Sequence, residues 1–217
     1  MALNATIYSF EITLNDADRG VYQALAFRAA RHPSETPEFL LTRVLAYCLE
    51  FCEGLTFSKG LSEPDAPALA IRDLTGALKS WIDIGTPDTA RLHRAAKAAS
   101  RVAVYSHRDV GALVAALAAD GVHRAQEIEI YALDRELLAA LAGRLVKRMC
   151  FDLAVSERTL YLTFDDETLT GNVTRYQSGA PAEHSARIQL RLIILHSSTQ
   201  APRRLRDSLQ PLIAARI

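Results

Sequence analysis

Between residues 78 and 142, segments typical of β-strands alternate with segments typical of helices, and this order constrains the fold more than any other feature. The runs at 78–84, 101–106 and 127–133 are rich in apolar, β-branched and aromatic residues. The segments that follow them, at about 88–99, 109–120 and 135–142, carry apolar residues at helical spacing. Strand–helix–strand order implies parallel strands joined by helical crossovers. We therefore expect an α/β protein.

Segments on either side of this core predict further strands. Residues 6–14 alternate apolar and polar side chains, as a half-buried strand does. Residues 69–74 and 78–84 flank Thr75-Gly76, which fits a hairpin turn. The remaining strand patterns are a short run at 55–58 and an antiparallel meander over 148–155, 159–164 and 169–175. We expect one mixed central sheet flanked by helices, with antiparallel additions from both ends of the core.

Two helices are predicted ahead of the alternating core. The first has an apolar face of Val21, Leu25 and Ala29, and it follows two aspartates that can cap a helix. The second has Thr36 at its N-cap and Pro37 in its first turn. Its apolar residues recur at three- and four-residue spacing until Gly54 ends the pattern.

The last forty residues differ in charge from the rest of the chain. Residues 178–217 hold six arginines against two acidic side chains, a local charge of +4, so residues 1–177 carry −4. Within this basic extension, 187–192 alternates like a strand and 203–217 has the pattern of a weak amphipathic helix. We predict a domain over 1–177 and a C-terminal extension over 178–217.

Composition removes several classes of function. The 217 residues carry 25 basic and 25 acidic side chains, so no overall basic field favours nucleic acid. The longest uncharged stretch in the helical middle, 110–119, is too short to cross a bilayer, and the N-terminus lacks a signal-peptide pattern, so we expect a cytoplasmic protein with no membrane contact. Cys48 and Cys52, one helical turn apart, are expected to be buried thiols. Common phosphate-loop, dinucleotide, zinc-protease and hydrolase motifs are absent.

Two aspartates stand out by their position. Asp73 ends one strand just before the hairpin turn, and Asp83 lies inside the next strand, on the face of Lys79 and Trp81. A helix-covered sheet is buried on both faces, and a buried carboxylate has to be paired, protonated or bound to metal. The alternative is a solvent-facing strand residue. The hairpin alone does not bring the two aspartates together, since Asp73 would face Leu78 or Lys79.

Four short segments form a recognisable set: Arg31-His32-Pro33-Ser34-Glu35-Thr36, Phe57-Ser58-Lys59-Gly60-Leu61-Ser62, Arg72-Asp73-Leu74-Thr75-Gly76 and Trp81-Ile82-Asp83-Ile84-Gly85. Together they resemble the bacterial YaeQ family. The opening residues 1–8 also resemble the start of that family. The resemblance covers about residues 1–177 and implies a variant of the PD-(D/E)xK nuclease fold. Family members usually end near residue 177, so nothing from the family applies to the extension.

The resemblance also implies a metal site. In that superfamily a helix and two strands supply carboxylates that hold Mg²⁺, or Mn²⁺ in its place, and the metal activates water next to a scissile phosphate. Residue by residue, Glu35 or Glu38 takes the helical position, and Asp73 and Asp83 take the strand positions. These four residues are therefore the candidate metal ligands.

The sequence departs from the superfamily pattern at the catalytic lysine. The lysine position, two residues after Asp83, is Gly85. YaeQ-like sequences commonly carry a lysine near position 94, and Arg94 stands there in this chain, which keeps the charge but cannot act as a base. A solvated helix face is the alternative for Arg94. The resemblance thus gives as catalytic candidates Glu38, Asp73, Asp83 and Arg94.

Three functions follow as hypotheses. The first is a metal-dependent phosphodiesterase that acts on nucleic acid. The second is a nuclease-like fold that binds nucleic acid or protein without cleavage, which Gly85 and the absence of a basic body favour. The third treats the acidic residues as a structural hydrogen-bond network. A fold does not by itself decide among them.

Overall fold

A computed structural model describes residues 5–58, 65–165 and 167–177. These residues all belong to the first of two compact units, 1–179. The strand predicted at 187–192 and the helix predicted at 203–217 lie outside the described residues. Among the described residues, no helix is both long and apolar enough to cross a membrane.

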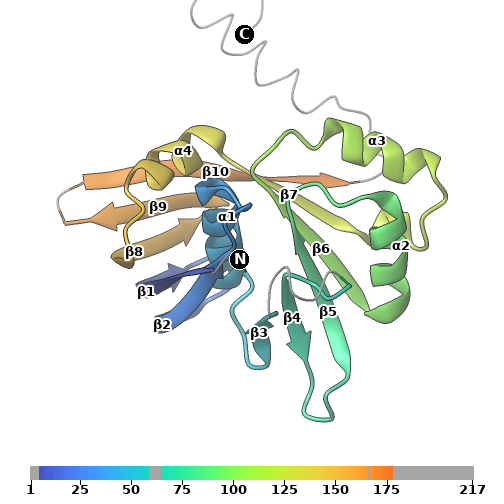
Figure 1. The fold of residues 1–217 in the computed structure, drawn as a ribbon, viewed down its shortest axis with the longest axis horizontal. Coiled ribbons are helices and arrows are strands. Elements are labelled where there is room, and N and C mark those ends of the chain that lie inside the picture. The colour runs from blue at the N-terminus through green and yellow to red at the C-terminus, as the bar shows by residue number, and fades with distance from the viewer. Residues whose placement is uncertain (1–4, 59–64, 166, 178–217) are drawn as a thin grey trace, which may run out of the picture. The chain divides into compact units, whose positions relative to one another are not determined.

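Ten described strands form one mixed sheet in the order β2-β1-β8-β9-β10-β7-β6-β5-β4-β3, shown in Figure 1. Strands β5, β6 and β7 are parallel, as the strand–helix alternation predicts, and β8, β9 and β10 form the predicted antiparallel meander. The mixed α/β class is therefore confirmed. The strands are β1 (Thr6–Asp16), β2 (Val21–Arg31), β3 (Leu55–Phe57), β4 (Leu69–Arg72), β5 (Leu78–Ile84), β6 (Arg101–Ser106), β7 (Glu129–Leu133), β8 (Arg148–Ser156), β9 (Thr159–Phe164) and β10 (Glu167–Gln177).

Strand β10 joins the two halves of the sheet. Its first part, from Glu167 to Asn172, pairs with β9, and its second part, from Val173 to Gln177, pairs with β7. Helix α4 (Arg135–Gly143) packs on β10 at Gly171, where a Cβ atom would lie 2.6 Å from a side chain of that helix. The sheet therefore requires glycine where it changes partners.

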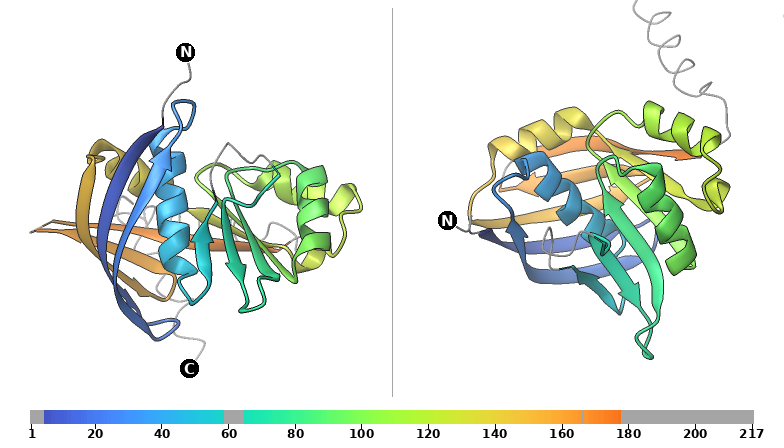
Figure 2. Two further views of the ribbon diagram at one scale, coloured as in Figure 1. Left: turned by 60° about the horizontal axis from the view of Figure 1, so that its bottom comes forward. Right: turned by 45° about the vertical axis from the view of Figure 1, so that its right-hand side comes forward.

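Helix α1 (Pro37–Leu49) lies between the two halves of the sheet, as Figure 2 shows. Thr36 caps it by accepting a hydrogen bond from the Phe39 amide, as the sequence predicts. One side of α1, including Leu41 and Leu45, packs on β1, β2, β8, β9 and α4, and Ala46 packs on β4, β5 and β6. A helix buried on several sides is apolar nearly all round.

Helices α2 (Thr89–Ala98) and α3 (Gly111–Ala119) cover the opposite face of β5–β7, at the right of Figure 1. Alternate residues of β5 therefore face different layers: Trp81 and Asp83 face α2, and Ile82 and Ile84 face α1. A short 3₁₀ helix covers Ala125–Glu127. Both faces of this half of the sheet are buried, as expected for crossover-connected parallel strands.

The helix predicted over 21–29 is wrong, because this segment is strand β2. It pairs antiparallel with β1 along all eleven residues, and Gly20, with φ of 67°, lies in the connecting turn. Val21, Leu25 and Ala29 are four residues apart, and this spacing puts them on one face of a strand as well as of a helix. Pairing with β1 decides between the two. Cys52 is likewise exposed, contrary to the prediction, whereas Cys48 is buried.

Candidate functional site

A cleft of about 400 Å³ opens at the carboxyl end of β5, beside the first turns of α1. One predicted carboxylate from the start of α1, Glu35, and one from a strand, Asp83, both line this cleft. Its lining residues are Glu35, Phe39, Arg43, Ser58, Ala66, Ala68, Asp83, Ile84, Gly85, Thr86, Pro87, Arg91, His107 and Arg108.

Asp83 is buried and held by an arginine of α2. Its side chain is 3% exposed, and its two oxygens accept hydrogen bonds from Nε and a terminal nitrogen of Arg91, both at 2.7 Å. Arg91 also donates to the carbonyl of Ala66, and its guanidinium lies 5.5 Å from the centre of the Trp81 ring. The hydrogen bonds from Arg91 to Asp83 raise the pKa of the guanidinium. The buried carboxylate is thus neutralised by pairing, one of the three solutions the sequence predicts.

Glu35 is held in the same way by an arginine of α1. Both Glu35 oxygens accept from the guanidinium of Arg43, at 3.2 and 3.3 Å, and each side chain of this pair is 6% exposed. The His32 amide donates to the same carboxylate, which fixes the turn before α1. Arg43 also donates to the carbonyl of Ala30 on β2. Burial lowers the pKa of Arg43, and the charge of Glu35 opposes this effect.

The other predicted residues lie outside the cleft. Asp73 sits in the β4–β5 turn, where it accepts hydrogen bonds from Thr75 and Ala77 and pairs with Lys79 at 3.1 Å. The hydrogen bond from the Thr75 hydroxyl, followed by the one from Lys79, lowers the pKa of Asp73. This placement agrees with the hairpin register, which sets Asp73 near Lys79 and away from Asp83.

Arg94 and Glu38 also do not line the cleft. Arg94 is 62% exposed and pairs with Asp65, so it occupies the solvated helix face that the sequence left as the alternative. Glu38 is half-buried in the first turn of α1. The cation that reaches Asp83 is Arg91, three residues earlier, where Asp88 caps α2 and accepts from the Arg91 amide. The capping aspartate, by fixing where α2 begins, is the sequence signal that could have selected Arg91.

Gly85 has a local explanation. Its φ is +88°, in the left-handed region that disfavours other residues by roughly 1–2 kcal/mol. A Cβ atom there would lie 3.5 Å from the ring of Phe39. The backbone at the end of β5 therefore disfavours a lysine at the superfamily position.

The described residues do not fit the metal implied by the resemblance. No group of three or more acidic, histidine or cysteine side chains within them could hold a metal ion. Mg²⁺ requires near-octahedral oxygen coordination, whereas each of the two cleft carboxylates has both oxygens bound to a guanidinium. A metal could bind here only after Arg43 and Arg91 had moved away.

The cleft as arranged carries an excess of positive charge. Among the described residues that line it, two carboxylates face three guanidinium groups, those of Arg43, Arg91 and Arg108, which leaves +1; Glu38 lies just outside this lining, and its charge acts on His107. Arg108 is exposed, and its side chain makes no ion pair or hydrogen bond with any described residue. Next to it, burial lowers the pKa of His107, and the nearby charge of Arg108 adds to this effect. The Nδ1 atom of His107 is buried and lacks a hydrogen-bond partner among the described residues.

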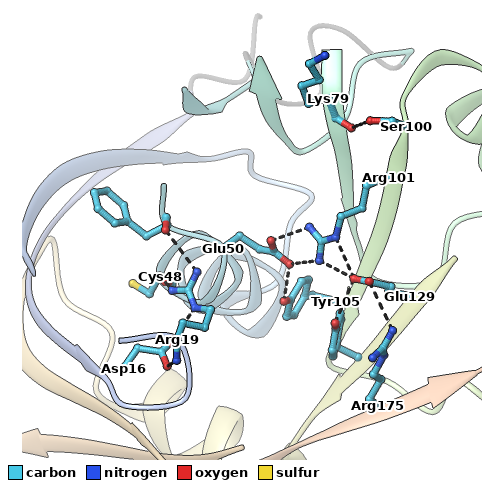
Figure 3. Close-up of polar contacts among 12 residues, drawn as sticks. Asp16, Arg19, Cys48, Glu50, Lys79, Ser100, Arg101, Tyr105, Glu129 and Arg175 are labelled. Carbon is cyan, nitrogen blue, oxygen red and sulfur yellow. Dashed lines mark hydrogen bonds and ion pairs between the residues drawn. The ribbon is translucent and has the colours of Figure 1, made fainter. Parts of the chain in front are cut away.

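A second polar cluster lies at the other end of α1 and was not found from the sequence (Figure 3). Glu50, which caps α1, accepts two hydrogen bonds from Arg101, at 2.7 and 2.8 Å, and one from the Tyr105 hydroxyl. Arg101 also binds Glu129, which pairs with Arg175. Two acids and two arginines balance one another. This cluster therefore ties α1 to β6, β7 and β10 without an unpaired charge.

Arg19 completes the same end of α1. It donates to the carbonyls of Cys48 and Phe51, at 3.0 and 3.3 Å, and pairs with buried Asp16. The Cys48 carbonyl belongs to the last turn of α1, at the negative end of the helix dipole, so a guanidinium there is stabilising. A cavity of about 240 Å³ opens beside this residue.

Comparison with known proteins shows the family. The sequence model described as "YaeQ protein" matches residues 1–173. "Uncharacterized protein YaeQ" of Escherichia coli K12 is 30% identical over 179 residues, which cover 82% of this chain and 98% of that protein. The protein of the same description from Salmonella typhi is 38% identical over 114 residues, 52% of this chain and 63% of that protein. The chain belongs to the YaeQ family.

Solved structures agree with this assignment. The crystal structure of the YaeQ protein from Xanthomonas axonopodis pv. citri has a TM-score of 0.73 and 30% identity, and the match covers 80% of this chain and 99% of that one. The YaeQ protein from Pseudomonas syringae has a TM-score of 0.73 and 31% identity, with 80% and 96% covered. The fold described above is therefore the fold of this family.

Proposed function

We propose that the protein binds nucleic acid by placing a backbone phosphate in the Arg108 cleft, and that it does so without metal-dependent cleavage. The observation that carries this proposal is the pairing of both buried carboxylates with arginines, which leaves Arg108 as the unpaired charge among the described residues that line the cleft. Such a site attracts an anion. A hard divalent cation would instead need the carboxylate oxygens that Arg43 and Arg91 occupy.

The donors of the cleft fit a phosphate. A guanidinium presents five N–H groups in a fixed geometry that matches phosphate oxygens. The imidazole of His107 lines the same cleft beside Arg108. A volume of about 400 Å³ lies within the usual range for small-ligand sites. The resemblance to nuclease folds gives the reason to choose nucleic acid among phosphate compounds.

A titration of a fluorescent single-stranded oligonucleotide, followed by anisotropy, tests the proposal. Each phosphate contact adds about 0.7 to the slope of log affinity against log salt for single strands. Arg108→Ala is expected to weaken binding and to reduce the slope by about that amount. Arg94→Ala is the matched control, because it removes an exposed arginine of the neighbouring helix outside the cleft. Equal losses in the two variants would refute the proposed site.

A metal-dependent phosphodiesterase is the second candidate, favoured by Glu35 and Asp83 facing one cleft. This function requires the two arginines to release their carboxylates. It predicts oligonucleotide products in Mg²⁺ or Mn²⁺ that disappear in Asp83→Asn. Incubation with either metal, followed by separation of products, distinguishes the two candidates: the phosphate-binding proposal expects an intact oligonucleotide.

A further inference from the structure

Among the described strands, β2 is an edge of the sheet, and no described strand pairs with its outer side. It pairs with β1 along all eleven residues and ends the strand order. An exposed edge carries unpaired N–H and C=O groups that can pair with another strand. Proteins often protect such edges with lysine, proline or bulges, yet β2 (VYQALAFRAAR) contains no lysine, proline, glycine or acidic residue. Its register with β1 is regular throughout.

The hydrogen bonds of β1 show which β2 residues face outward. The Ser9 amide donates to the Lys147 carbonyl, and the Ala17 amide donates to the Val155 carbonyl. The backbone N–H and C=O groups of odd-numbered β1 residues therefore point toward β8, and those of even-numbered residues point toward β2. Antiparallel partners such as Tyr8 and Ala29 face each other. The backbone N–H and C=O groups of odd-numbered β2 residues therefore point toward β1, and those of even-numbered residues point away from it.

An independent contact supports this assignment. The carbonyl of Ala30, an even residue of β2, accepts from the Arg43 side chain instead of a β1 amide. The other outward backbone groups belong to Tyr22, Ala24, Ala26 and Arg28, and among them the Ala24 carbonyl accepts a long hydrogen bond, at 3.4 Å, from the exposed Gln23 side chain. Their side chains are all exposed, and Tyr22 is 67% exposed. An exposed tyrosine at a bare edge is the kind of side chain that contacts a partner.

From this geometry we infer that β2 pairs antiparallel with β2 of a second copy of the chain, with Leu25 on the two-fold axis. In this register every outward residue of one copy lies opposite an outward residue of the other: Tyr22 opposite Arg28, and Ala24 opposite Ala26. About eight hydrogen bonds form, because each such pair exchanges two. The Ala30 carbonyl stays with Arg43. A register centred on Ala26 would place Ala30 opposite Tyr22 and compete for that carbonyl.

The charge of Arg28 also favours this register and favours a second copy of the chain as the partner. Registers centred near Arg28 would set the two copies' guanidinium groups side by side, whereas the register centred on Leu25 puts each over the partner's Tyr22 ring, an attractive cation–π arrangement. Directly opposed side chains of a strand pair interact, and like charges there repel. The strand is thus complementary to itself.

Substitutions at Tyr22 test the inference on the full-length chain by sedimentation equilibrium. The wild type is expected to associate reversibly to twice 23.8 kDa. Tyr22→Glu places an acid opposite Arg28 and should tighten the dimer, whereas Tyr22→Arg places two cations together and should weaken it. Because each dimer holds two such pairs, the two dissociation constants should differ by about tenfold. Both variants change one exposed side chain, so both should keep the wild-type melting temperature when all three are melted at concentrations where they are monomers, since dimer formation itself raises the melting temperature.

Ala26→Pro provides a second test. Its amide faces away from β1, so proline removes no bond within the chain, and edge strands tolerate proline at such positions. This variant should remain a 23.8-kDa monomer, with a melting temperature close to that of the wild type measured at a concentration where the wild type is also monomeric. A wild type that stays monomeric at the highest soluble concentration would overturn the inference. A dimer whose affinity is the same in both Tyr22 variants would also overturn the inference. That result would mean that the contact is formed by another surface or by another segment, such as residues 187–192.

Discussion

Replacing Arg91 by methionine tests how the cleft is held together. Methionine keeps much of the side-chain length but leaves the Asp83 carboxylate, which is 3% exposed, without a cation. Breaking a buried pair in this way costs about 3–5 kcal/mol. Because Arg91 is 22% exposed and faces a cleft that water can enter, we expect about 3 kcal/mol. For a chain of this size, that corresponds to a fall in melting temperature of about 6–12 °C.

The reciprocal change should cost less. Asp83→Asn leaves a cation that can reach water and still binds the Ala66 carbonyl, so we expect a loss of about 1 kcal/mol. The double variant should be more stable than Arg91→Met alone, because it contains no buried charge. Urea unfolding of the three variants measures these differences. The reasoning is refuted if Arg91→Met is no more destabilising than Asp83→Asn.

Three further predictions concern other regions. Glu50→Gln should lower the free energy of unfolding by about 2 kcal/mol, because it weakens two hydrogen bonds from Arg101; a loss under about 0.5 kcal/mol in urea unfolding would contradict the bracing role. Gly171→Ala should lower the free energy of unfolding by about 2 kcal/mol or more, because its Cβ would lie 2.6 Å from a side chain of α4. The control Gly143→Ala, which has open space around its Cβ, should be neutral or slightly stabilising. A thermal melt compares the two variants. Burial raises the pKa of Cys48 to about 12, so a thiol reagent at pH 8 should modify two cysteines in the native protein and the third only after unfolding; three fast thiols would contradict this.

The same Cys48 thiol gives the expected sign of the pH dependence. In the unfolded chain the thiol ionises near pH 9, whereas in the folded chain it keeps its proton to about pH 12. Its contribution to stability is therefore fully present below pH 9 and lost as the pH rises from 9 to 12. Urea unfolding at pH 8 and pH 10, with Cys48→Ala as reference, measures the loss.

Local sequence signals were sufficient for most elements. The Thr36 cap, the Thr75-Gly76 turn and the alternation of strands and helices from residue 78 onward act over a few residues, and the structure has α1, the β4–β5 hairpin and the parallel strands where they predict them. The segment 21–31 could not be assigned in this way. A four-residue apolar spacing fits either element, and only pairing with β1 selects the strand.

The site depends on contacts between distant segments, which explains why only part of it was predicted. Glu35 and Asp83 face the same cleft because α1 packs across the end of β5. Asp73 does not, because its turn pairs it with Lys79. The arginines that neutralise both acids were not predicted: the Asp88 cap fixes where α2 begins and so bears on Arg91, whereas Arg43 has no comparable local signal. That metal and catalysis belong to this site stays a prediction.

The affinity of Asp83→Asn for an oligonucleotide in EDTA tests the central claim most directly. Removing one negative charge raises the charge of the cleft from +1 to +2, so an anion-binding site should bind more tightly, by about threefold or more at low salt. The wild type should bind under the same conditions. Binding that requires Mg²⁺ or Mn²⁺ in the wild type and is lost in Asp83→Asn would contradict the account.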